Sequence, residues 1–194
     1  MNIAIIPTVR EIYKDQLELC VDKRIFFLFN KVFKNKCSFK ILNGLNNIEN
    51  EKLIVILGGN TISNISKKKK NKIRSSLDEK YFLQAKKAGI KIVGICHGAQ
   101  YIASLFGAKF KKSKSHVNKL HKIKFDKKDY MVNSYHNYIF SSYGKKILPL
   151  ATCDDKSIEF FKINNFEIYG ILWHPERYKR IKKLDLKILR KICN

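Results

Sequence analysis

Five consecutive aliphatic residues, Leu53 to Leu57, run directly into the glycine pair Gly58-Gly59. A run of this length without a polar residue is typical of a strand that is buried on both faces and ends in a tight turn. A second apolar segment, Ile90 to Ile95, follows after a stretch with a helical pattern. Because short apolar runs alternate with helical patterns, the sequence predicts an α/β domain with a mostly parallel sheet.

The other segments continue this alternation. Strands are predicted at 2–7 and 38–42, and shorter mixed or antiparallel strands at 115–117, 120–125, 130–133, 158–163 and 167–173. Helices are predicted at 13–33, at 78–88, at 101–105 and at 177–193, because apolar residues recur there at helical spacing. The Lys-rich stretch 63–76 is predicted as a loop. No repeat or linker divides the chain, so 1–194 is predicted to be one domain.

The charge of the chain restricts its function without deciding it. Of 194 residues, 40 are Lys or Arg and 16 are Asp or Glu, which gives a formal net charge of +24. A hydrophobic content of 45% excludes a disordered polycation. The chain is rich in Lys, Ile and Asn. An A/T-rich coding sequence would produce this bias, and with it much of the positive charge. The alternative is that a basic surface attracts an anionic ligand, either nucleic acid or a small phosphorylated molecule.

The sequence has no apolar stretch long enough for a membrane span, and its first residues are too short for a signal peptide. We therefore expect a cytoplasmic protein with no membrane partner. The five cysteines are scattered and form no CxxC pair, so no disulfide framework or metal site is predicted. We expect no metal and no cofactor, and a structural or solvent-exposed role for His116 and His121.

The sequence Gly94-Ile95-Cys96-His97-Gly98 joins a predicted strand to a predicted helix. This context matches a nucleophile elbow, in which glycines allow a strained turn that presents the central side chain. A cysteine at a helix N-terminus favours the thiolate, and the N–H of the next residue can donate to an oxyanion. The alternative is a small buried cysteine in a glycine turn.

A proton carrier for this thiolate is predicted 78 residues later. An apolar strand ends at His174, Pro175 stiffens the turn, and Glu176 is close enough in sequence to orient the imidazole. A nucleophile, a base and an orienting carboxylate are then all present, which is the logic of a catalytic triad.

These motifs together resemble the class I glutamine amidotransferases, which are Cys-His-Glu enzymes acting on γ-glutamyl amides. The resemblance rests on the turn at 58–59, the elbow at 94–100, the segment 132–136 and the segment 170–176. The segment 7–10 and the Asn-Ser-x-His pattern are more similar to free-standing γ-glutamyl hydrolases than to glutaminase domains fused to synthases. The resemblance implies a three-layer sandwich of flavodoxin-like type around the sheet.

The resemblance also implies roles for individual residues. Cys96 would form a thioester with the γ-carbonyl, with His174 as acid and base and Glu176 as its partner. The oxyanion would be held by backbone N–H groups of Gly59 or Asn60 and of His97. The glutamyl pocket would be lined by Gly58, Gln100, Ser134, Tyr135 and His136. Two departures, His97 and Asn137 where many γ-glutamyl hydrolases have Arg and His, affect recognition of the leaving group.

The leaving group decides the biological role. The Lys-rich run 66–72, in particular Lys67 and Lys68, follows the glycine turn on the edge of the sheet where α/β enzymes bind ligands. We therefore expect a cysteine hydrolase that releases glutamate from an anionic or nucleotide-linked γ-glutamyl conjugate. The alternatives are a glutaminase subunit that passes ammonia to a separate synthase partner and, less favoured, a nucleic-acid-binding protein.

Overall fold

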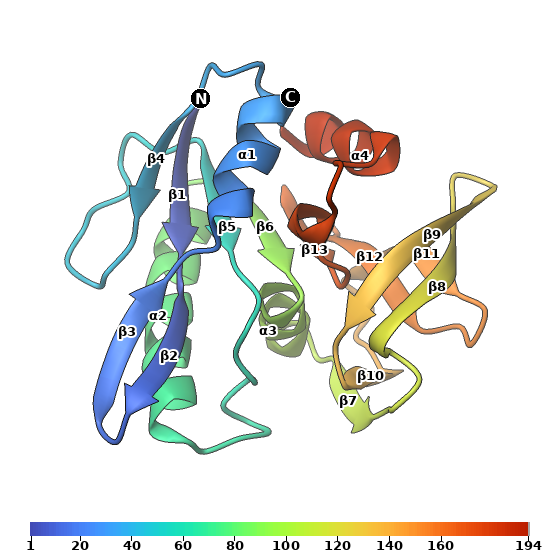
Figure 1. The fold of residues 1–194 in the computed structure, drawn as a ribbon, viewed down its shortest axis with the longest axis horizontal. Helices are drawn as coiled ribbons and strands as arrows, with labels where there is room; N and C mark the ends of the chain where they lie inside the picture. Colours follow the sequence, from blue (N-terminus) through green and yellow to red (C-terminus); the bar gives the residue numbers. More distant parts are fainter. Residues whose placement is uncertain (194) are drawn as a thin grey trace.

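The structure, a computed structural model, describes residues 1–193. Its strands and helices follow one another along the chain as shown in Figure 1. In order they are β1 (Asn2–Ile6), β2 (Thr8–Tyr13), β3 (Gln16–Cys20), α1 (Lys23–Val32), β4 (Ser38–Ile41), β5 (Leu53–Ile56), α2 (Lys69–Lys87), β6 (Lys91–Ile95), α3 (His97–Leu105), β7 (Lys109–Lys112), β8 (Val117–Phe125), β9 (Lys128–Tyr135), β10 (Tyr138–Ser142), β11 (Ile147–Cys153), β12 (Ile158–Ile163), β13 (Ile168–Ile171), the 3₁₀ turn η1 (Pro175–Arg177) and α4 (Lys183–Cys193).

One nine-stranded sheet organises the molecule, in the order β4-β1-β5-β6-β13-β12-β11-β8-β9. The strands from β4 to β13 are parallel, and those from β13 to β9 are antiparallel. The predicted parallel sheet with antiparallel strands in its second half is thereby confirmed. Two hairpin-like pairs, β2-β3 and β7-β10, lie outside this sheet.

Two apolar cores cover the two faces of the sheet. Ile3 and Ile5 of β1 face a core that includes residues of α1 and α4, whereas Ala4 and Ile6 face a core that includes residues of α2 and α3. Because successive side chains of a strand point to opposite faces, this alternation requires helices on both sides. The three-layer α/β sandwich implied by the resemblance is therefore confirmed (Figure 1).

The predicted helix over 13–33 is wrong in its first half. Strands β2 and β3 form an antiparallel hairpin there, turning at Asp15, and the helix α1 begins only at Lys23. Asp22 caps it by accepting a hydrogen bond from the backbone N–H of Arg24 at 3.0 Å. Leu17 lies on β3, but its distance in sequence from the apolar residues of α1 fits helical spacing. The predicted helix was therefore extended into the hairpin.

Other predicted bounds also differ from the structure. Helix α2 begins at Lys69 and not at 78. Its first turns were not predicted because the first buried positions on its inner face are the polar residues Asn71 and Arg74, which carry no apolar signal. Helix α3 begins at His97 instead of 101, α4 begins at Lys183, and strand β8 begins at Val117. Within residues 1–193, no helix is long and apolar enough to cross a membrane.

Strands β5, β6 and β13 place three segments with predicted site residues at one edge of the sheet. They are adjacent and parallel, with Ile56 paired with Gly94 and Ile95 paired with Ile171. The residues that leave these strands at their carboxyl ends therefore meet at the same edge, which is where open α/β sheets bind ligands. Those residues are the glycine turn, the elbow cysteine and His174.

Candidate active site

Cys96 lies between strand β6 and helix α3 in a strained backbone conformation. Its φ angle is 51°, in the left-handed region that a residue with a side chain rarely adopts, and it is the N-cap of α3. Backbone strain of this kind persists only where surrounding structure enforces it, and it is concentrated at functional sites. The predicted elbow conformation is therefore present at Cys96 itself.

The glycines on either side of Cys96 allow close packing of α3 on the sheet. A Cβ added to Gly94 would lie 2.4 Å from the carbonyl carbon of Gly98, and one added to Gly98 would lie 2.2 Å from the carbonyl oxygen of Ile56. Neither glycine has a positive φ angle. The strain of the elbow is thus confined to Cys96, while its glycines let the helix N-terminus approach β5 and β6.

His174 follows strand β13 and is held on two sides. Its Nδ1 lies 2.6 Å from Oε1 of Glu176, so the ring donates there and its Nε2 is left for the cavity side. Its backbone is clamped by the side chain of Asn133 on β9, which donates to the carbonyl and accepts from the N–H, both at 2.8 Å. Sequence reasoning did not single out Asn133, although it lies within the 132–136 segment.

Cys96 and His174 each shift the pKa of the other toward its charged form. Burial opposes ionisation of the thiol, but the charge of His174 and a hydrogen bond from it outweigh burial and lower the pKa of Cys96. Burial also opposes protonation of the imidazole, yet Cys96 and Glu176 raise the pKa of His174 to about 9. Both pKa shifts go in the direction of a thiolate beside an imidazolium.

Gly58 leaves the space in which these two side chains meet. A Cβ at this position would lie 2.7 Å from Cε1 of His174 and 3.2 Å from Cβ of Cys96. Its carbonyl accepts a 2.6 Å hydrogen bond from the hydroxyl of Thr8. The side chain of Asn60 accepts from the N–H of Val9 and donates to its carbonyl, both at 3.0 Å. The turn 58–60 is thus fixed against the start of β2.

A buried ionic network lies beneath this turn. Arg74 is fully buried, and its guanidinium donates to Asp78 at 2.8 Å and to the carbonyls of Pro7 and Leu57 at 2.7 Å. The ring of His97 contacts Oδ2 of Asp78 at 2.7 Å and the carbonyl of Asn60 at 3.1 Å. Burial and the adjacent Arg74 lower the pKa of His97. The His97 side chain is therefore occupied here, and sequence reasoning missed Arg74 and Asp78.

Two adjoining cavities open around Cys96 and His174. The first, of about 280 Å³, is lined by Gly59, Asn60, Thr61, Cys96, Gln100, Val117, Tyr135, His136, Asn137, Tyr138, His174 and Arg177. The second, of about 220 Å³, is lined by Thr8, Arg10, Cys20, Asp22, Ile25, Leu57, Gly58, Gly59, His174, Glu176 and Arg177. The two cavities share Gly59, His174 and Arg177, so one ligand could extend from one cavity into the other.

Most of the residues predicted for substrate binding line these cavities, but three do not. Lys67 and Lys68 are exposed and line neither cavity. Ser134 is buried and its hydroxyl donates to the carbonyl of His116. Sequence reasoning missed Arg177, which lies beside the expected Glu176. Its guanidinium is stacked on the ring of Tyr135 at 4.9 Å, and that ring lies 5.7 Å from His174.

A second cysteine also lies near histidine and glutamate side chains. Cys153, His116 and Glu159 come close together on the antiparallel half of the sheet, together with His121. Burial and the charge of Glu159 raise the pKa of the Cys153 thiol, the opposite of the shift at Cys96. Since the thiolate is the nucleophilic form, the electrostatics favour Cys96 over Cys153 as the nucleophile.

The sequence matches a protein family whose members agree with this fold and these motifs. The family described as Glutamine amidotransferase class-I matches residues 25–191. This chain therefore belongs to the class I glutamine amidotransferase family. A gamma-glutamyl-CDP-amidate hydrolase from Campylobacter jejuni subsp. jejuni is 30% identical over 135 residues, which cover 70% of this chain and 67% of the relative.

More distant relatives share the family or the fold. The putative glutamine amidotransferase-like protein YvdE of Lactococcus lactis is 24% identical over 132 residues, and the match covers 57% of this chain and 56% of that protein. The crystal structure of a putative GMP synthase component from Thermoplasma acidophilum has a TM-score of 0.74 at 18% identity, covering 100% of this chain and 92% of its own. A glutamine amidotransferase from Thermotoga maritima has a TM-score of 0.65 at 20% identity, covering 100% and 89%.

Proposed function

We propose that the chain is a γ-glutamyl amide hydrolase that uses Cys96 as its nucleophile. The observation that carries this proposal is the pairing of a strained elbow cysteine with His174, where the pKa of the thiol is lowered and that of the imidazole is raised. We further propose that residues 1–194 form one catalytic domain that works in the cytoplasm without a metal in the reaction.

The reaction proceeds in two halves. The Cys96 thiolate attacks the γ-carbonyl carbon, and backbone N–H groups of Gly59 or Asn60 and of His97 hold the oxyanion. The His174 imidazolium gives its Nε2 proton to the leaving nitrogen as the C–N bond breaks, which leaves a γ-glutamyl thioester. Neutral His174 then takes a proton from water, and the resulting hydroxide attacks the thioester. Glutamate leaves and the thiolate is restored.

The glutamyl group occupies the first cavity and the leaving group the second. Gln100, Tyr135 and His136 line the first cavity and would contact the α-amino and α-carboxylate groups, and Ser134 supports this wall from behind. In the second cavity, Arg10 and Arg177 supply cations that suit phosphate. A nucleotide-linked substrate such as γ-glutamyl-CDP-amidate fits this division, and the named relative supports it. A role in capsule polysaccharide biosynthesis belongs to the same proposal.

The test measures glutamate released by the purified chain from γ-glutamyl-CDP-amidate, from an uncharged γ-glutamyl amine and from glutamine. We expect turnover without any partner, fastest with the nucleotide substrate, and a loss of at least about 10³-fold in Cys96→Ser. Cys37→Ser, at a cysteine that lines neither cavity, is the matched control and keeps the activity. Undiminished activity in Cys96→Ser contradicts the proposal.

The same assay separates the alternatives. A glutaminase subunit would hydrolyse glutamine only after a synthase partner is added, and it would be inactive on the nucleotide substrate. A nucleic-acid-binding protein would bind DNA or RNA in a salt-sensitive manner in both the parent chain and Cys96→Ser, with no glutamate released from any substrate.

A further inference from the structure

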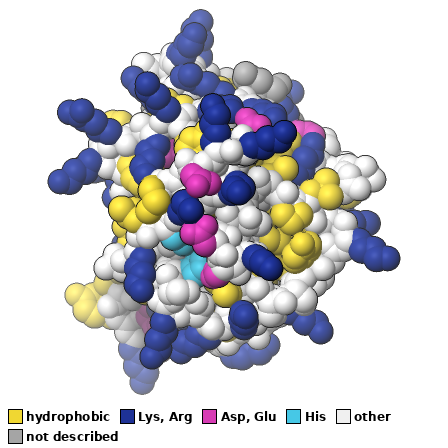
Figure 2. Space-filling view, turned by 90° about the vertical axis from the view of Figure 1, so that its right-hand side faces the viewer, with side chains coloured by type: hydrophobic (Ala, Val, Ile, Leu, Met, Phe, Trp, Pro, Cys, Tyr) yellow, Lys and Arg dark blue, Asp and Glu magenta, His cyan; other side chains and the backbone are white. Residues whose placement is uncertain are grey.

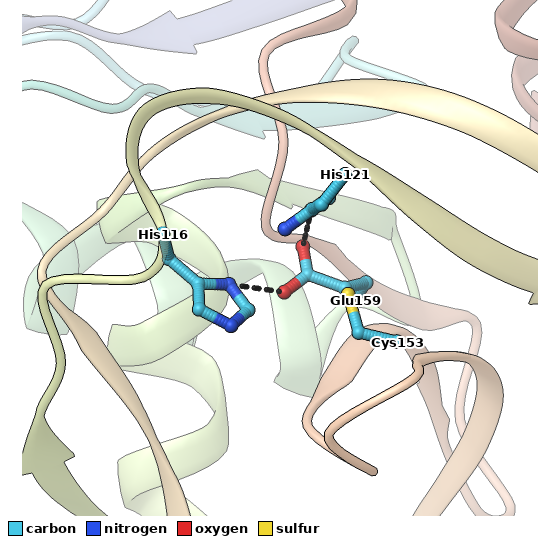
Figure 3. A group of neighbouring side chains, drawn as sticks. All are labelled: His116, His121, Cys153 and Glu159. Atoms are coloured by element: carbon cyan, nitrogen blue, oxygen red, sulfur yellow. Dashed lines mark ion pairs between the residues drawn. The ribbon is translucent and has the colours of Figure 1, made fainter.

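A compact group of metal-ligating side chains lies outside the two cavities (Figure 3). It consists of His116 before β8, His121 on β8, Cys153 at the end of β11 and Glu159 on β12, and we call it the His-Cys-Glu cluster. One ligand atom from each residue lies within 4.8 Å of the others. Glu159 is fully buried, and among residues 1–193 neither of its carboxylate oxygens has a hydrogen-bond partner.

The contacts of His116 leave a place for a positive charge beside Glu159. Its Nε2 lies 2.9 Å from Oδ2 of Asp155, and because a carboxylate only accepts, Nε2 carries the proton. In the neutral ring, Nδ1 then presents a lone pair to Oε1 of Glu159 at 3.2 Å. The lone pair of Nδ1 and the charge of this buried carboxylate repel each other unless a second proton or a metal ion offsets them.

The distances between these histidines and Glu159 also fit ligands of one metal ion. His121 Nε2 lies 3.4 Å from Oε2 of Glu159, and neither this contact nor the 3.2 Å contact of His116 meets the geometry of a hydrogen bond. Four N or O ligands at the bond lengths typical of zinc, about 2.0–2.2 Å, lie about 3.3–3.6 Å apart on a tetrahedron. The two observed separations are close to that edge length.

We propose that the His-Cys-Glu cluster is a zinc site that joins strands β8, β11 and β12. Two imidazoles, one thiolate and one carboxylate form a donor set suited to tetrahedral zinc, and four protein ligands leave no open position for catalysis. Zinc replaces the proton of the Cys153 thiol, which is released to solvent. Binding draws the widest-spaced ligand atoms together by about 1 Å.

The surroundings of the cluster are those of a prepared metal site. Metal-bound histidines commonly donate their second N–H to a carboxylate, as His116 does to Asp155. Asp155 is in turn held by the backbone N–H of Ser157 at 3.0 Å and by its hydroxyl at 2.6 Å. On the face shown in Figure 2, histidine atoms reach the surface beside acidic side chains. The His121 side chain is 14% exposed and that of Asp155 is 42% exposed, so the cluster lies near solvent.

The zinc site would also support the wall of the first cavity. His136 lines that cavity, and its Nε2 lies 3.4 Å from the Glu159 oxygen that faces His116. Fixing Glu159 on a metal therefore fixes the side of His136 that faces away from the substrate. This consequence, unlike the zinc site itself, rests on the proposed function.

The experiment measures metal bound per chain after expression with zinc and exhaustive dialysis, using Cys96→Ser as the parent so that the candidate nucleophile cannot bind metal. We expect about one zinc per chain, retained in the further variant Cys37→Ser and lost in Cys153→Ser. Asp155→Asn should weaken zinc binding by about 10–100-fold. Zinc that stays bound in Cys153→Ser, or no zinc in the parent, overturns the proposal.

Two further readouts use the Cys96→Ser chain alone, so they do not depend on how well the ligand variants fold. Cobalt(II) added to the metal-free Cys96→Ser chain should give the thiolate charge-transfer absorption of a tetrahedral site, and zinc should abolish it. Added zinc should also raise the melting temperature of that chain. Absorption without a thiolate band, together with an unchanged melting temperature, overturns the proposal in favour of a cluster held by protons alone.

Discussion

At the scale of single residues, the proposed chemistry depends on the orientation of one thiol and one imidazole. The sequence predicts Cys96, His174 and Glu176 as a triad, because Cys96 and His174 follow buried strands and Glu176 lies two residues after His174. Sequence reasoning does not reveal Asn133 as a clamp on His174, or Gly58 as the space between the two side chains. Those roles arise from contacts between segments tens of residues apart.

The pKa of His174 predicts the alkaline limit of activity. Protonation of the leaving nitrogen needs the imidazolium, so kcat/KM should fall as pH rises through about 9, the raised pKa of this group. Glu176 is one cause of that rise, and Glu176→Gln should therefore move the limb to lower pH by roughly one unit. The measurement is a pH profile of kcat/KM for both chains. An alkaline limb that stays in place in Glu176→Gln contradicts this role of Glu176.

Gly58→Ala should reduce activity while preserving the fold. The added methyl group would lie 2.7 Å from the His174 ring and 3.2 Å from Cβ of Cys96, so it separates the two side chains. We expect kcat to fall about 100-fold with a small change in melting temperature. Gly89→Ala is the control, because its Cβ meets nothing within 4 Å and its positive φ costs about 1–2 kcal/mol of stability. Equal activity in both variants would show that Gly58 does not need this space.

At the scale of elements, strongly apolar segments were predictable and polar or exposed ones were not. Strands β5 and β6 are uniform enough to be identified from composition alone. The hairpin β2-β3 was missed because it lies outside the main sheet and has mostly exposed side chains. The first turns of α2 were missed because their inward side chains, Asn71 and Arg74, are satisfied by hydrogen bonds instead of apolar contacts.

Helix α4 carries a buried acid that should make stability depend on pH. Burial raises the pKa of Asp185 to about 7, and the indole N–H of Trp173 donates to it at 2.9 Å. The unfolded chain releases this proton near pH 4, whereas the folded chain keeps it until about pH 7. The free energy of unfolding should therefore fall as pH rises from about 4 to 7 and stay lower above that.

Replacing Asp185 should remove this loss of unfolding free energy at higher pH. Asp185→Asn keeps an acceptor for Trp173 and should stabilise the chain by about 2–4 kcal/mol at pH 9, with little effect at pH 4. Urea unfolding at the two pH values measures the difference. The exposed Asp154→Asn serves as the comparison and should change neither value much. A stabilisation of equal size at both pH values would rule out ionisation of Asp185 as its cause.

At the scale of the whole molecule, the net charge of +24 is not concentrated in one groove on the face that Figure 2 shows. Lys and Arg side chains are spread around that face. Such a distribution produces a general positive field, which raises the local concentration of anionic ligands and is screened by salt. The contribution of individual lysines then depends on whether they line the cavities.

This distinction separates Lys67 and Lys68 from Arg177. The double variant Lys67→Ser, Lys68→Ser should change KM for a phosphorylated γ-glutamyl substrate by no more than about twofold, because both side chains are exposed and screened. Arg177→Met, which changes both cavities, should raise that KM on the order of tenfold. KM values for charged and uncharged substrates measure both effects. A larger effect of the lysine variant on KM would show that the Lys-rich run takes part in substrate binding.

The most direct test of Cys96 as the nucleophile is covalent labelling with a chloroketone analogue of glutamine, followed by mass spectrometry of the digested chain. Cys96 and Cys153 compete in one experiment, each near a histidine and a glutamate. A label on Cys96 at one per chain, abolished by Cys96→Ser and unaffected by Cys153→Ser, is the predicted result. A label on Cys153, or one that persists at full stoichiometry in Cys96→Ser, would contradict the account.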